Sequence, residues 1–283
     1  MGWCIQAACW AALGWGIWWP RHTPAEAQWP KSGYRARYAF RLPDAVDECS
    51  GAVPWTDSTF LTHNDDGPAE LYEVSYQGSL VKTIPVPGAR NQDWEDLTRD
   101  TTGTLYIADL GNNRNNRHNL ALYRYRPGQP TADRLPVRYA DQTAWPPPRH
   151  RQNYDCEAVF THRGRLYAVS KNRGRQTVKV YRLPTAPGDS LASVVDSARV
   201  FYPITGAAVS PNGKVLALVA YGMVYLYGLD GTERVLAHPL ARLRFHKGGQ
   251  AEAIWWRDAH RLYVANEAQR VFCFERRDGQ AME

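Results

Sequence analysis

The chain has 283 residues, of which 44% are apolar and 22% are charged, so it can bury a sizeable core. Eleven tryptophans and 16 tyrosines against three methionines favour strands over helix bundles. The net charge of +6 is spread along the chain without a basic helix or a nucleic-acid-binding motif, so we expect no nucleic-acid partner.

Residues 1–27 differ in composition from the rest of the chain. The uncharged apolar stretch CIQAACWAALGWGIWW is followed by a polar stretch that ends in AEA, which places Ala25 and Ala27 at the recognition positions for cleavage before Gln28. The pattern predicts a signal peptide over 1–27 and a secreted, periplasmic or cell-surface domain over 28–283. In the open alternatives, an uncleaved segment or a lipid on Cys9 attaches the protein to a membrane.

Short apolar runs between clusters of Gly, Pro, Asn and Asp fill the remaining sequence, which is typical of an all-β fold. Tyr34–Leu42 alternates like a strand. Five units with a common plan follow it, over 48–86, 93–140, 155–203, 204–238 and 250–277. Each unit contains four expected strands except the last, which ends one strand short. The fourth strands of the third and fourth units are expected at 198–203 and 232–238.

Four-stranded units arranged radially form a β-propeller, in which ring closure protects the sheet edges. The five units therefore predict a single five-bladed propeller. The strand at Tyr34–Leu42 is expected to close the ring as the outer strand of the last blade. A six-bladed ring is the alternative, because the stretch 127–152 is long enough to hold further strands.

Polar residues recur two positions apart at the start of each unit, as in NYDCEAVF. Residues two apart on a strand share a face, so the innermost strands should stack these side chains in two layers along the central channel. The intervening Cys156 should face the packing between sheets. One layer contains Ser50, Glu95, Glu157, Thr205 and Glu252, and the second layer contains Glu48, Asp93, Asp155, Pro203 and Gln250.

The two layers predict a calcium ion on the channel axis. Each layer gathers about three carboxylates and no Lys or Arg in the same register, and such crowding disfavours ionisation unless a cation intervenes. Calcium accepts roughly 6–8 oxygen ligands in irregular geometry, whereas zinc and copper prefer His or Cys. The layer with Glu157 is the expected main ligand set. The alternative is a wet channel whose acids are hydrated or bonded to the backbone.

Polar turns after the second strand of each unit should surround the same mouth of the channel. Asp65 or Asp109 is the expected general base. The expected ligand-binding residues are Asn64, Asn112, Asn113, Arg114, Lys171, Asn172, Arg173, Asn266 and Glu267. The cationic members predict an anionic ligand, either a small molecule or a polymer.

The motifs ECSG, WEDL, IADLGNN, NYDCEA, ITGA, AEAI and ANE resemble those of exported bacterial β-propeller proteins with no assigned activity. A more distant resemblance is to calcium-activated nucleotidases (apyrases), five-bladed propellers in which Ser and Glu side chains hold one axial calcium. Their Ser-Glu-Glu-Ser-Glu series is repeated here as Ser50, Glu95, Glu157, Thr205 and Glu252, with one Ser→Thr change. Their acidic-Arg-Thr-Gly turn and their paired arginines are replaced by HNDDG and SKNR, so the resemblance implies the metal ring more than the phosphate-binding groups.

Two functions are consistent with this sequence. The first is a calcium-dependent hydrolase of phosphate esters or anhydrides, with a lactonase, esterase or glycosidase as variants. The second is a non-enzymatic propeller that binds a ligand or partner and holds calcium structurally. The chain contains no Gly-x-Ser-x-Gly elbow, P-loop or His-Glu-x-x-His motif. We expect a monomer in either case.

Overall fold

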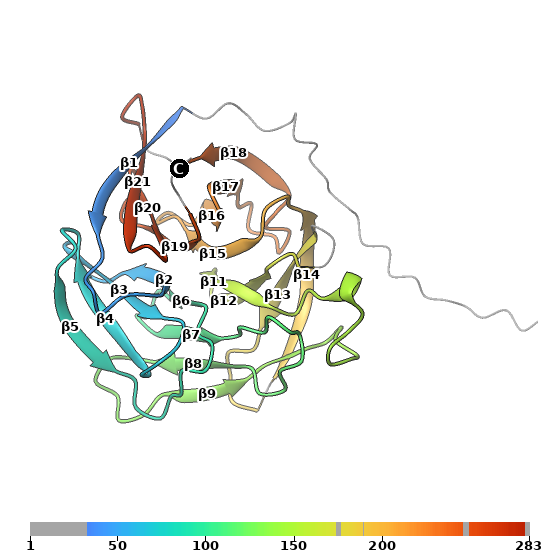
Figure 1. Cartoon of the computed structure of the whole chain (residues 1–283). Helices are drawn as coiled ribbons and strands as arrows, with labels where there is room; N and C mark the ends of the chain where they lie inside the picture. Colours follow the sequence, from blue (N-terminus) through green and yellow to red (C-terminus); the bar gives the residue numbers. More distant parts are fainter. Residues whose placement is uncertain (1–32, 174–176, 189, 246–248, 281–283) are drawn as a thin grey trace, which may run out of the picture.

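Five β-sheets surround a central axis, as the five sequence units predict (Figure 1). This structure, a computed structural model, describes residues 33–173, 177–188, 190–245 and 249–280. The predicted signal peptide lies outside the described residues. Within the described ranges a short 3₁₀ helix covers Arg149–Arg151, and no helix there is long and apolar enough to cross a membrane.

In the first four blades the strands follow one another outward from the axis in sequence order. Blade 1 contains β2 (Cys49–Pro54), β3 (Thr59–Asn64), β4 (Glu70–Ser75) and β5 (Leu80–Pro85). Blade 2 contains β6 (Asp96–Arg99), β7 (Leu105–Asp109), β8 (Ala121–Tyr125) and β9 (Asp133–Pro136). Blade 3 contains β11 (Cys156–His162), β12 (Arg165–Ser170), β13 (Thr177–Leu183) and β14 (Leu191–Arg199). Blade 4 contains β15 (Ile204–Val209), β16 (Val215–Ala220), β17 (Met223–Gly228) and β18 (His238–Arg244).

Blade 5 combines strands from both ends of the described chain (Figure 1). Its inner three strands are β19 (Ala251–Trp256), β20 (Leu262–Asn266) and β21 (Arg270–Arg276). The outermost strand, β1 (Tyr34–Arg41), pairs antiparallel with β21. The predicted closure by the N-terminal strand is therefore confirmed.

The stretch 127–152 contains no sixth blade. It contributes β9 to blade 2 and β10 (Arg138–Tyr139), which pairs in parallel with β14 as a fifth strand of blade 3. The expected fourth strands at 198–203 and 232–238 are wrong in position. The fourth strand of blade 3 is β14, which begins before that range, and the fourth strand of blade 4 is β18, which begins at the end of it. The apolar residues that suggested them, including Val200 and Leu236, are buried between blades 3 and 4 instead of lying in a strand.

Each pair of neighbouring blades encloses one hydrophobic cluster, so five clusters complete the ring among the described residues. Neighbouring side chains on one strand pack against different blades: Val159 faces blade 2 and Phe160 faces blade 4. This arrangement buries both faces of the inner strands in each blade, which explains why those strands are nearly continuously apolar. Cys156 belongs to the cluster between blades 2 and 3, as alternation predicts, and its thiol is free.

The closing strand should contribute to stability through one buried ring. Phe40 on β1 contacts Phe60 of blade 1 and Tyr263 of blade 5, with both centroid separations 6.1 Å. We expect Phe40→Ala to lower the free energy of unfolding by about 3 kcal/mol or more, because it leaves a cavity in this cluster. Urea unfolding followed by tryptophan fluorescence measures the change.

The matched control is Tyr38→Ala on the same strand, since Tyr38 is 56% exposed. Its cost should stay below about 1 kcal/mol, as is usual for surface positions. Equal costs for the two variants would contradict a stabilising role for the buried side of β1.

Candidate functional site

A bulge near the start of four inner strands sets one side chain apart from the regular pairing. The register shifts by one residue in four inner strands, and the residues left without a strand partner are Ser50, Glu157, Thr205 and Glu252. Directly before β6, the Glu95 N–H donates to the carbonyl oxygen of Ala108 at 2.9 Å, and Ala108 is also the strand partner of Asp96. Bulges bend a strand and re-aim its side chains. The five residues of the predicted layer thus occupy equivalent positions.

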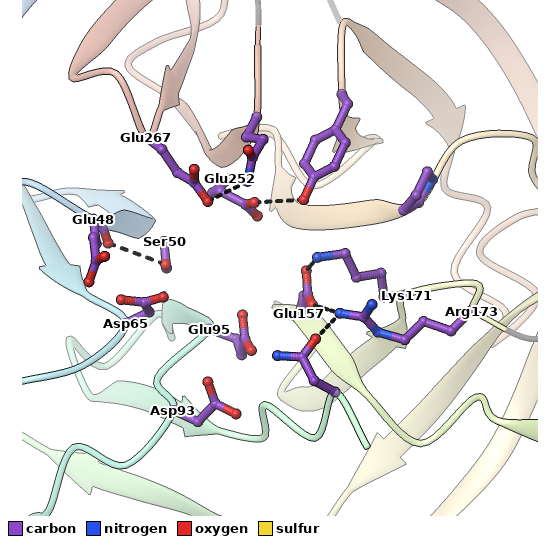
Figure 2. Close-up of a pocket in the computed structure, with 14 residues that line it drawn as sticks. Glu48, Ser50, Asp65, Asp93, Glu95, Glu157, Lys171, Arg173, Glu252 and Glu267 are labelled. Carbon is purple, nitrogen blue, oxygen red and sulfur yellow. Dashed lines mark hydrogen bonds and ion pairs between the residues drawn. The ribbon is translucent and has the colours of Figure 1, made fainter. Parts of the chain in front are cut away.

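A cavity of about 350 Å³ lies at the amino-terminal ends of the inner strands (Figure 2). It is lined by Glu48, Ser50, Asp65, Asp93, Glu95, Asn113, Glu157, Lys171, Arg173, Pro203, Tyr221, Gln250, Glu252 and Glu267. Four members of the predicted Glu157 layer are in this set. Thr205 is not, because it is buried and its hydroxyl donates to the carbonyl oxygen of Ala251 at 2.5 Å.

The second predicted layer lines the cavity except at Asp155. That carboxylate is fully buried and accepts a hydrogen bond from the backbone N–H of Asn112 at 2.7 Å. It also pairs with Arg173, which lines the cavity. Asp155 therefore supports the cavity wall from behind.

Two cations from the loop after β12 neutralise the acids of blade 3. The Lys171 ammonium pairs with Glu157, and Arg173 pairs with Asp155 and, at 3.2 Å, with Glu157. Arg173 also donates to the side-chain oxygen of Asn113 in blade 2. No Lys or Arg lies in the register of the layers, as expected, but these two rim residues reach the acids from a loop. Strand register therefore did not reveal these contacts.

The acids on the opposite side of the cavity have no such partners (Figure 2). Glu48, Asp65 and Glu252 make no ion pair with another described residue. The neighbouring Asp65 carboxyl raises the pKa of Glu48 to about 7, and burial raises the pKa of Glu252 to about 7. Burial also raises the pKa of Asp65. Glu48 and Glu252 therefore lose their protons at a higher pH than free carboxyls do.

Acidic oxygens converge at two places around this cavity. One carboxylate oxygen from each of Glu95, Asp155 and Glu157 lies within 4.8 Å of the others, and Glu48, Asp65 and Asp66 form a similar group. Burial raises the pKa values of Glu95 and Glu157 well above the usual range. No His or Cys lines the cavity among the described residues. An all-oxygen donor set of this kind fits a hard cation such as calcium.

The predicted rim residues divide into two groups. Asp65, Asn113, Lys171, Arg173 and Glu267 line the cavity, as expected. The cavity lining does not include Asn64, Asp109, Asn112, Arg114, Asn172 or Asn266.

Several of these remaining polar residues stabilise their own loops. The Asn112 side-chain oxygen accepts hydrogen bonds from the backbone N–H groups of Asn116 and Arg117. The Asn172 amide donates to the carbonyl oxygen of Val200 at 2.5 Å. Asp109 accepts a hydrogen bond from Arg117 at 2.7 Å. Such contacts are ordinary turn chemistry for Asn and Asp.

Asp96 is a buried carboxylate beside the channel axis that strand alternation did not identify. One oxygen accepts hydrogen bonds from the backbone N–H groups of Val159 in blade 3, at 2.8 Å, and Ala207 in blade 4, at 3.4 Å. The other accepts from the N–H of Leu97 at 2.8 Å. A Cβ atom on Gly51 would lie 2.7 Å from Asp96. Asp96 thus connects three blades in a space that glycine leaves open.

A signal for Asp96 is present in the sequence. The position after each predicted layer residue is small in the other four blades, where it is Gly51, Ala158, Gly206 or Ala253. Asp96 is the one acid in this series, and it fills the space that the small residues leave near the axis.

Similar folds are found among solved structures, although no family model and no curated protein matches the chain. The PQQ-bound aldose sugar dehydrogenase of Streptomyces coelicolor aligns with a TM-score of 0.53 and 11% identity, over 87% of this chain and 99% of that chain. A gluconolactonase from Xanthomonas campestris aligns with a TM-score of 0.47 and 13% identity, over 87% of this chain and 81% of that chain. At 11% identity the first similarity supports the β-propeller fold and nothing about activity.

The raised pKa of Glu252 gives the metal-free protein a predictable pH dependence. Its folded pKa of about 7 exceeds the ordinary value of 4.5, so the stabilisation is complete at acidic pH and is lost as the pH rises through about 7. The shift corresponds to a loss on the order of 3 kcal/mol for this group. We expect the melting temperature in chelator to fall by several degrees between pH 5 and pH 8.

Glu252→Gln should reduce this fall, because the amide does not titrate. Glu275→Gln is the control, since Arg37 lowers the pKa of Glu275 and its loss should not reduce the fall. An unchanged pH slope in Glu252→Gln would show that this carboxyl is not the group responsible.

Proposed function

We propose that the protein is a calcium-binding β-propeller whose axial cavity holds one Ca²⁺. The main support for this proposal is the imbalance of charge in the cavity lining, which contains seven carboxyl side chains and two cationic side chains. Carboxyl groups crowded in this way are stabilised by a cation that several of them share. The resemblance of the bulge residues to the apyrase calcium ligands supports the same assignment.

Ser50, Glu95, Glu157 and Glu252 are the proposed ligands, with Glu48 and Asp65 beside them. Thr205 is a weaker candidate because its hydroxyl donates to a backbone carbonyl. When bound, calcium would polarise an oxygen of an anionic ligand and lower the pKa of a coordinated water. The proposed ligands are all oxygen donors, and no His or Cys of the described chain lines the cavity, which is consistent with calcium rather than with zinc or copper.

The proposed enzymatic activity is hydrolysis of a phosphate ester or anhydride. Asp65 is the preferred general base, because it lines the cavity and one of its oxygens is buried without a hydrogen-bond partner among the described residues. Burial raises the pKa of Asp65 toward the range in which a carboxylate can accept a proton. Asp109 is less suitable, since Arg117 already holds its carboxylate.

A non-enzymatic role is the second candidate, and one observation favours it. Lys171 and Arg173 are the two cations that line the cavity in the described chain, and both are paired with carboxylates. An anionic ligand would therefore have to compete with Glu157 and Asp155 for them. In this case the cation stabilises the ring, and the cavity binds a ligand or partner without chemistry. Under both proposals we expect the protein to be exported to the periplasm or cell surface and to be a monomer.

Calcium titration of the chelator-treated protein by calorimetry tests the metal site. We expect one binding event in the wild type and an affinity at least tenfold lower in Glu157→Gln, because the variant loses a buried ligand charge. The control is Glu233→Gln, a glutamate that pairs with Arg165 and Arg182 outside the cavity. It should bind calcium like the wild type. A wild-type protein that binds no calcium would refute the proposal.

A substrate panel separates the enzyme from the binder. Nucleotides, sugar phosphates, lactones and aryl esters should be assayed with calcium and with chelator. For the hydrolase we expect turnover that requires calcium and falls at least a hundredfold in Asp65→Asn, as is typical for loss of a general base. Inactivity across the panel favours the binder, whereas turnover that persists in chelator contradicts a calcium-dependent reaction.

A further inference from the structure

We propose that Lys171 is a tethered cation that neutralises Glu157 in the metal-free cavity, and that a divalent ion displaces its ammonium when it binds. This inference rests on the proposed function, because it concerns how the same cavity controls cation binding. It makes Lys171 a residue that determines which cations the cavity accepts.

A backbone hydrogen bond fixes the position of Lys171 at the end of β12. Lys171 directly follows β12, and its N–H donates to the carbonyl oxygen of Asp155 at 2.8 Å. Its side chain is 10% exposed and reaches Glu157, whose side chain is 2% exposed (Figure 2). The ammonium thus meets a proposed calcium ligand inside the cavity.

An aromatic ring connects Lys171 to a second acid, Glu252. The Lys171 Nζ is 5.5 Å from the ring centroid of Tyr221, within the range of a cation–π contact. The Tyr221 hydroxyl donates to Glu252 at 3.1 Å. Burial would lower the pKa of Lys171, but Glu157 and Glu252 hold it above its usual value. The charged ammonium therefore lies between acids of blades 3 and 5.

Lys171 is the more displaceable of the two cavity cations. Arg173 contacts Asp155, Glu157 and Asn113 through its planar guanidinium. The Lys171 ammonium is a compact charge on a flexible four-carbon chain, so it can leave Glu157 without any change in the backbone. A divalent ion at Glu157 and Glu252 would both replace this charge and add a second one.

Tethering also implies selectivity among cations. The ammonium is covalently held near Glu157, so its effective concentration there far exceeds that of a free ion of the same charge. A sodium or potassium ion offers the carboxylates no more charge than the ammonium does. A divalent ion does, and it should be favoured for that reason.

The test compares calcium binding to the wild type, Lys171→Met and Lys179→Met by calorimetry. Lys179 is a matched control outside the cavity, since it pairs with Asp141 at 2.5 Å and lies 4.7 Å from the ring of Tyr154. We expect Lys171→Met to bind calcium at least tenfold more tightly than the wild type, because the competing cation is gone. Lys179→Met should bind with wild-type affinity.

Thermal unfolding in chelator and in calcium provides the second readout. Metal-free Lys171→Met should melt below the wild type, because a buried carboxylate loses its partner. Calcium should raise its melting temperature by more than it raises that of the wild type. Circular dichroism verifies that each variant is folded before titration.

The outcomes separate the two proposals. Equal or weaker calcium binding in folded Lys171→Met than in a binding wild type overturns the role of Lys171 alone. Binding in Lys171→Met but not in the wild type supports the tethered cation and refutes calcium binding by the natural protein. Absence of binding in both overturns both proposals.

Discussion

The crowding of carboxyl groups about one axis is the constraint on which the rest of the site depends. Five inner strands converge there. Four of them place a polar side chain at a bulge, and Glu95 lies at the equivalent position before β6. One lysine and one arginine side chain compensate the acids of blade 3, whereas the pKa values of Glu48 in blade 1 and Glu252 in blade 5 are raised to about 7. The cavity is therefore electrostatically asymmetric.

Much of the fold was predictable because the same four-stranded unit recurs five times in the sequence. The recurring turn and strand pattern predicted the blade number, and the alternation of Tyr34–Leu42 predicted ring closure. The errors arose where apolar residues pack outside strands. Val200 and Leu236 are buried like strand residues, yet they fill the space between blades 3 and 4 outside any strand. Hydrophobicity identifies burial, but it does not distinguish a buried loop from a strand.

The candidate site was predictable where strand register alone determines position. The spacing in NYDCEAVF correctly placed Glu157 at the cavity and Cys156 in the packing between blades. Two features were not predicted, namely the pairing of Lys171 with Glu157 and the inward position of Asp96. The contacts of Lys171 depend on the path of a loop. Asp96 occupies space that Gly51 leaves open and bonds to the backbone of blades 3 and 4, which the sequence spacing does not reveal.

The closing strand has a consequence for how the chain is made. β1 is synthesised first among the described strands, while its partner β21 is among the last, so β1 must wait until all of residues 42–269 have followed it. At ribosomal rates of about 5–20 residues per second, the wait is roughly ten to fifty seconds. An unpaired strand is an aggregation hazard during that time. Arg35, Arg37 and Arg41 give β1 a strongly basic character that helps it stay soluble until its partner is synthesised.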